Sequence, residues 1–148
     1  MIKSMHPFSI VALWLLGCTA QAQDDRRLLE AIGQVESGMN RNARGDNGLA
    51  RGAYQLHASA WSDANLLLEM EGHYSYSFGQ WRDATAQDMT ALAYLRVIRS
   101  RLASLGIPTP TPEVIALCWN RGVLGAHRLN FAPNDYAIRV ANLYRLVR

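Results

Sequence analysis

Apolar residues recur at helical spacing along most of the chain, and this pattern predicts a mostly helical fold. Asp24 or Asp25 can cap the first helix. The apolar stripe of this helix consists of Leu28, Leu29, Ile32, Val35 and Met39. We expect a second helix over ASAWSDANLLLEM, capped by Ser59 and stopped by Gly72.

The second half of the chain predicts three more helices. Thr85-x-x-Asp88 resembles a capping box that opens a long helix, which is closed by Gly106 and Pro108. Its apolar stripe consists of Ala91, Leu95, Ile98, Leu102 and Leu105. Thr111-Pro112 begins a further helix that ends near Gly122. Asn134 can cap the last helix, which runs through Ile138, Leu143 and Leu146.

A glycine-rich segment, RNARGDNGLARGAYQLH, interrupts this helical pattern. Asp46-Asn47-Gly48 is a strong turn signal, so a short hairpin or an irregular loop is expected there. EGHYSYSFGQWRD has no clear period and predicts a loop. The fold class is therefore predicted to be α+β, mostly α, with a small β-hairpin region after the first helix.

The N-terminal stretch MIKSMHPFSIVALWLLGCTAQAQ has the layout of a secretory signal. Lys3 precedes an apolar run that is too short to span a bilayer, and a small-residue site follows at Ala20-Gln21-Ala22. We therefore divide the chain into a signal peptide over 1–22 and one domain over 23–148. A buried N-terminal helix is the structural alternative. Leu15-Leu16-Gly17-Cys18 resembles a lipobox, and processing there would leave Cys18 lipidated.

Composition limits the function classes. The chain has 148 residues, enough for one domain. Its net charge of +3 is too small to argue for a nucleic-acid partner. After cleavage at Ala22 only Cys118 would remain, which excludes an internal disulfide. Cys118 lies in the apolar run VIALCW and is expected to be an inert core residue.

Glu36 breaks the pattern of the first helix, because it falls inside the apolar arc. A carboxylate on the core side must be paired, line a cleft or stay protonated. Burial would raise its pKa, which suits a general acid near neutral pH. The alternative is a glutamate at the helix rim that either reaches out to water or pairs with an arginine such as Arg51 or Arg121.

Four short motifs follow one another from this glutamate onward: VESGMN, GAYQ, WNRG and DYAIRVANLY. In order and spacing, from about Leu28 to Tyr144, they resemble the lysozyme-like superfamily, and most closely the soluble-type lytic transglycosylases and the goose-type lysozymes. Trp119 stands where the family usually has tyrosine. A hydroxyl contact to the catalytic glutamate is therefore missing or supplied elsewhere. GAYQLHASAW is also similar to invertebrate-type lysozymes, which are disulfide-rich, so this likeness ranks second.

The resemblance implies cleavage of the β-1,4 bond after N-acetylmuramic acid in peptidoglycan. Glu36 would protonate the leaving oxygen and then act as base on the C6 hydroxyl, which gives a 1,6-anhydro product. The implied substrate-binding residues are Ser37, Tyr54, Gln55, Trp119 and Asn120. Hydrolysis would need a second acid, for which Asp46 is the candidate. A turn function explains Asp46 better than catalysis does, so the sequence favours the transglycosylase.

Other residues leave the interpretation open. The aromatic side chains of Tyr74, Tyr76 and Trp81 can stack on sugars or fill the core. The histidines show no metal-ligand spacing, so neither metal nor cofactor is expected. The expected protein is a periplasmic or secreted monomer, or an outer-membrane lipoprotein, that acts on peptidoglycan glycan strands and has no transmembrane span once processed. The alternatives are an inactive glycan-binding module and an exported protein that binds anionic surfaces through its arginines.

Overall fold

The computed structural model describes the backbone of residues 7–147 and the side chains of residues 20–147. Lys3 of the predicted signal and the Cys18 side chain lie outside these ranges. Within them the chain forms five α-helices: α1 (Pro7–Ser37), α2 (Ala58–Met70), α3 (Ala84–Ser104), α4 (Pro112–Arg128) and α5 (Asp135–Leu146). No helix of this described part is both long enough and apolar enough to cross a membrane.

The only sheet of the described chain is a small antiparallel hairpin after α1. Strands β1 (Arg44–Gly45) and β2 (Ala50–Arg51) are joined by the 3-10 turn η1 (Asp46–Gly48). A second 3-10 turn, η2 (Phe78–Gln80), precedes α3. The prediction of an α+β fold that is mostly helical is therefore confirmed.

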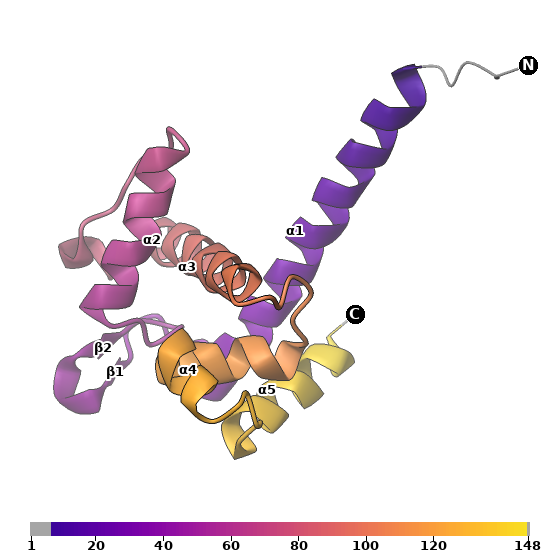
Figure 1. The fold of residues 1–148 in the computed structure, drawn as a ribbon. Coiled ribbons are helices and arrows are strands. Elements are labelled where there is room, and N and C mark those ends of the chain that lie inside the picture. Colours follow the sequence, from indigo (N-terminus) through magenta and orange to yellow (C-terminus); the bar gives the residue numbers. More distant parts are fainter. Residues whose placement is uncertain (1–6, 148) are drawn as a thin grey trace, which may run out of the picture.

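The helices pack in pairs around one core. In Figure 1, α5 lies against α4 and against the C-terminal part of α1, while α2 packs against α3. The predicted stripes point inward, since Ile32, Leu95, Ile98 and Leu102 are fully buried. Leu105 is an exception at 43% exposure, because it follows the end of α3.

Some predicted helix boundaries were wrong. Helix α1 begins at Pro7, so Asp24 and Asp25 lie inside it, because no proline interrupts the preceding residues. Within residues 20–147, the first four residues are exposed, Asp24 is half-buried and Asp25 is buried. Asp25 is buried and pairs with Arg99 of α3, whose Nη2 lies 2.7 Å from its Oδ1. The hydroxyl of Tyr144 on α5 donates to Asp24.

The later caps are partly as predicted. Thr111 and Asn134 cap α4 and α5 with side-chain hydrogen bonds, as expected. His57, one residue before the helix, stands at the cap position of α2 instead of Ser59. Asp83 caps α3 instead of Thr85, and its carboxylate accepts from the Ala86 N–H. Helix α4 continues past Gly122, which kinks it at a φ of 69°.

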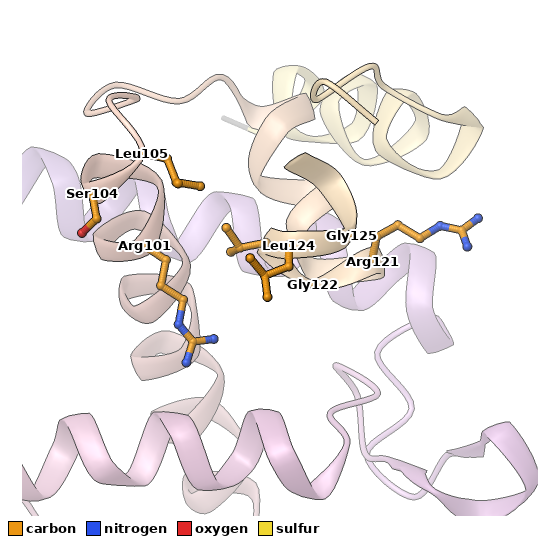
Figure 2. Close-up of a pocket in the computed structure, with 8 residues that line it drawn as sticks. Arg101, Ser104, Leu105, Arg121, Gly122, Leu124 and Gly125 are labelled. Atoms are coloured by element: carbon orange, nitrogen blue, oxygen red, sulfur yellow. The ribbon is translucent and has the colours of Figure 1, made fainter. Parts of the chain in front are cut away.

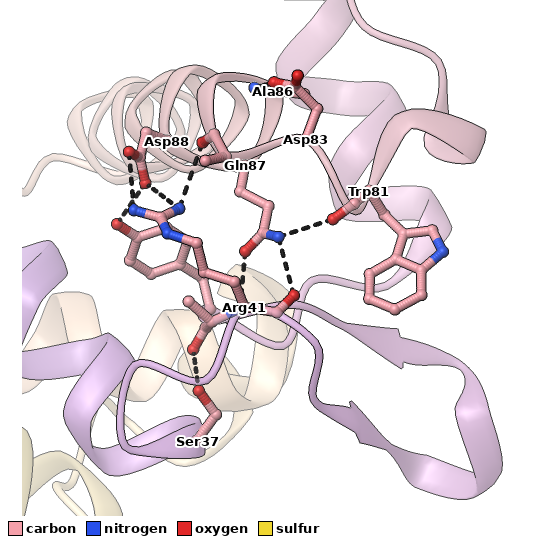
Figure 3. Close-up of polar contacts among 10 residues, drawn as sticks. Ser37, Arg41, Trp81, Asp83, Ala86, Gln87 and Asp88 are labelled. Carbon is pink, nitrogen blue, oxygen red and sulfur yellow. Dashed lines mark hydrogen bonds and ion pairs between the residues drawn. The ribbon is translucent and has the colours of Figure 1, made fainter.

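A buried glutamine on α3 holds the base of the hairpin (Figure 3). Gln87 accepts from the Ala53 N–H at 2.8 Å and donates to the carbonyls of Trp81 and Arg41 at 2.8 Å and 3.0 Å. Gly52 passes so close to it that a Cβ there would lie 2.6 Å from the Gln87 Oε1. Gln87 therefore ties the base of the hairpin to the helical body.

The hairpin has two different faces. Arg44 and Arg51 pair across the strands, and each guanidinium lies 5.3 Å from the centroid of the Trp81 ring. Gly45 and Ala50, on the alternate positions, face the cleft described below.

Candidate functional site

A cleft of about 550 Å³ lies where the end of α1 meets the hairpin, the start of α2 and the middle of α4. This size is typical of small-ligand sites. Glu36 lies in the last turn of α1, and Gly38 and Met39 end that helix with left-handed φ angles of 62° and 61°. The chain therefore turns away immediately after Glu36, which leaves the carboxylate at the cleft wall.

Glu36 is half-buried and accepts a hydrogen bond of 2.6 Å from the Tyr136 hydroxyl. Burial raises the pKa of Glu36, while the bond from Tyr136 opposes this rise; the charge of Asp46 raises the pKa further and His57 lowers it. No ion pair joins Glu36 to an arginine within residues 20–147. The alternative of a rim glutamate paired with Arg51 or Arg121 was therefore wrong.

Tyr136 is the residue that sequence reasoning missed. Asn134 caps α5 through the Ala137 N–H at 2.9 Å and so sets Tyr136 in the first turn, facing Glu36. Burial and the Glu36 charge hold the pKa of Tyr136 well above its usual value, so the phenol stays a neutral donor. The sequence offered one signal: with Trp119 where the resemblance led us to expect tyrosine, a hydroxyl contact to Glu36 was expected to be missing or supplied elsewhere, and Tyr136 of DYAIRVANLY supplies one.

Asp46 and His57 also line the cleft. Asp46 opens the hairpin turn at a φ of 47°, and its Oδ2 lies 2.7 Å from the His57 Nε2. Both side chains are open to solvent. The cleft therefore holds a second carboxylate beside Glu36. No sequence pattern connected His57 with Asp46.

Three of the predicted binding residues line the cleft. Gln55, held at a φ of 50°, donates from its amide to the Gly52 carbonyl at 2.7 Å. Trp119 is 9% exposed, packs edge to face on Tyr94 and donates to the Tyr54 carbonyl at 3.3 Å. Asn120 is exposed at the lip, where its carbonyl oxygen accepts from the Asn134 amide.

Two predicted binding residues do not line the cleft. The Ser37 hydroxyl donates to the Ala53 carbonyl at 2.8 Å (Figure 3). The Tyr54 hydroxyl donates to Asp88 at 2.8 Å, and Asp88 also pairs with Arg41. Both side chains brace the hairpin against α1 and α3. Their assignment to substrate contact is corrected, because these hydrogen bonds hold both side chains away from the cleft.

The other aromatic candidates also lie elsewhere. Trp81 is 6% exposed beneath the guanidiniums of the hairpin. Tyr74 and Tyr76 border a separate groove beside α2. Neither set lines the cleft around Glu36.

A second hollow of about 560 Å³ adjoins the cleft at the kink of α4 (Figure 2). Gly122 lines both spaces. The hollow lies between Leu124 of α4 and the end of α3 at Arg101 and Leu105. The kink therefore opens the surface of α4 on both sides of the chain.

In the described part of the chain no three His, Cys, Asp or Glu side chains are grouped to hold a metal ion. Cys118 is fully buried, and burial raises the pKa of its thiol to about 11. Its predicted role as a core residue rather than a nucleophile is consistent with this burial.

No protein-family model, curated protein or solved structure matches this chain significantly.

Proposed function

We propose that the chain is an exported peptidoglycan-cleaving enzyme with a lysozyme-like domain, and that it works as a lytic transglycosylase. The observation that carries the proposal is the half-buried Glu36 at the wall of a cleft, with a raised pKa and a hydrogen bond from Tyr136. A carboxyl group whose pKa is raised by burial holds a proton closer to neutral pH and can deliver it to a leaving oxygen.

The reaction needs one protein carboxyl group. Glu36 donates its proton to the glycosidic oxygen while the bond from C1 to that oxygen breaks. The N-acetyl group of the same sugar assists by bonding to C1. The ionised Glu36 then takes the proton of the C6 hydroxyl, whose oxygen forms the new bond to C1 while the bond from C1 to the N-acetyl group breaks. Tyr136 supports the first step, since the hydrogen bond that it donates stabilises the carboxylate formed when Glu36 releases its proton.

The remaining cleft residues provide sugar contacts in this proposal. The free Gln55 carbonyl oxygen and the exposed Asn120 side chain can bind N-acetyl and hydroxyl groups. Trp119 and Tyr94 form an apolar wall beside them. Export would place the enzyme in the periplasm or outside the cell, with its substrate in reach.

Hydrolysis is the second candidate, and Asp46 favours it. Its carboxylate lines the same cleft as Glu36 and raises the pKa of that residue. Ionised Asp46 could activate a water molecule or stabilise a cationic sugar, as the second carboxylate of a glycosidase does. The hydrogen bond between Asp46 and His57 competes with the contact that Asp46 would make to a water molecule or a sugar, so we place hydrolysis second.

Mass spectrometry of peptidoglycan digests tests the proposal. The protein, Glu36→Gln and Asp46→Asn would be compared, with Asp63→Asn as control, because Asp63 pairs with Arg101 outside the cleft. Anhydro products that vanish only in Glu36→Gln support a transglycosylase. Products with reducing ends that also vanish in Asp46→Asn would establish a lysozyme instead. If the four proteins bind glycan but none cleaves it, the chain is an inactive glycan-binding module.

A further inference from the structure

A groove separate from the cleft lies between α2 and the segment that follows it. Its volume is about 510 Å³. In Figure 1 this segment returns alongside α2 toward the start of α3. The groove is lined by one face of α2, from Ala58 to Glu69, and by residues 74–78 and Gln80.

Two aromatic rings form one wall of the groove. Tyr74 is 68% exposed, although it is a large side chain, and its ring meets Tyr76 edge to face with the centroids 4.9 Å apart. The Trp61 indole donates to the Tyr76 carbonyl at 2.6 Å and packs edge to face on Phe78. The backbone beneath the tyrosines is therefore fixed, and Tyr74 presents a ring that is already positioned for a ligand.

The polar groups of the groove suit a neutral ligand with many hydroxyl groups. The hydroxyls of Ser62 and Ser75 and the carboxylate of Glu69 make no hydrogen bond within the described residues, so all three can bind a ligand. Glu69 is the single charged side chain among the lining residues, and no arginine joins it. An anionic ligand would be repelled, and a purely apolar one would leave the polar groups without partners.

A ligand with one apolar face and a rim of hydroxyls is a sugar ring. We propose that the groove is a second carbohydrate subsite that takes N-acetylhexosamine units of the strand cut at Glu36. The choice of this sugar rests on the proposed function. Tyr74 stacks on the face of a ring, and Ser62, Ser75 and Glu69 bind its hydroxyls.

The first turn of α2 connects the two sites. Ala58 lines the groove, whereas Ser59 and Ala60 line the cleft. At 100° per residue the two faces lie roughly 150° apart around the helix. One strand can therefore pass around this turn and occupy both sites, so a long oligosaccharide gains contacts that a short one lacks.

The test is a titration of the full-length Glu36→Gln protein with a β-1,4-linked N-acetylglucosamine hexasaccharide. Calorimetry gives the Kd, and NMR follows the ring signals of Tyr74. We expect the sugar to shift these signals and Tyr74→Ala to raise the Kd about tenfold. Tyr74→Phe keeps the ring and should retain the affinity. Leu66→Ala is the matched control, because Leu66 is exposed on α2 outside the groove.

A Kd for Tyr74→Ala within twofold of the parent, unshifted Tyr74 signals, or no binding at all would overturn the inference. The peptidoglycan digests separate this result from the proposed function. If cleavage depends on Glu36 but hexasaccharide binding does not depend on Tyr74, only the inference about the groove is refuted. Binding at Tyr74 without cleavage would refute the enzyme and retain the groove as a glycan site.

Discussion

Replacement of Gln87 by methionine should loosen the hairpin without emptying the core. Methionine has nearly the same shape, so the change removes three hydrogen bonds and little packing. Each such bond contributes roughly 1 kcal/mol net, and the Ala53 N–H and two carbonyls would lose their buried partner. We therefore expect Gln87→Met to lower the free energy of unfolding by about 3–5 kcal/mol, a large share of a domain's total of about 5–15 kcal/mol.

Urea denaturation followed by circular dichroism measures this loss. The slope of the transition should stay unchanged while the midpoint falls by roughly 1.5–2.5 M, given a slope of about 2 kcal/mol/M. Gln80→Met is the matched control: the Gln80 side chain accepts one exposed bond from the Ser77 N–H, so its loss should cost under about 1 kcal/mol. Equal losses in the two variants would refute our account of how the hairpin is held.

Three further predictions follow from the ionisable groups. Tyr136→Phe removes the hydrogen bond that lowers the pKa of Glu36, so the pKa of Glu36 should rise. Because Glu36 must be protonated to act as the acid, the alkaline limb of the pH–rate profile should move to higher pH. An alkaline limb that does not move would contradict this role of Tyr136. Arg99→Met should lower the free energy of unfolding in urea by about 3 kcal/mol, because it leaves the buried Asp25 carboxylate without its cation. A decrease below about 1 kcal/mol would show that this ion pair is not needed for stability. Cys118 should resist a thiol reagent at neutral pH until the protein unfolds, because it is fully buried and its thiol pKa is about 11; fast labelling of the folded protein would contradict that burial.

The sequence predicted the elements that depend on local chemistry. Asp46-Asn47-Gly48 forms the hairpin turn, and Thr111 and Asn134 cap their helices, because neighbouring residues alone decide these structures. It also indicated that Glu36 faces inward, since the helical period fixes the direction of each side chain.

The sequence failed where distant segments meet. Tyr136 lies 100 residues after Glu36, and no periodicity connects the two. The same holds for Gln87, which reaches back to Ala53 and Arg41. Ser37 and Tyr54 were assigned to the cleft by motif alone, but each hydroxyl binds a group distant in the chain, the Ala53 carbonyl or Asp88, and a short motif does not encode such partners.

The position of Asp24 and Asp25 has a consequence for maturation. Residues 20–23 are exposed on α1, Asp24 is half-buried and Asp25 is buried. If the leader is removed after Ala22, as the sequence predicts, these two carboxylates move from mid-helix into the first turn of a shorter helix. There the partial positive charge of the helix dipole would stabilise them by about 0.3–1 kcal/mol each. Removal of the leader would thus stabilise the new N-terminal end of α1. Arg99 and Tyr144 bind Asp25 and Asp24 and so keep this end packed against α3 and α5.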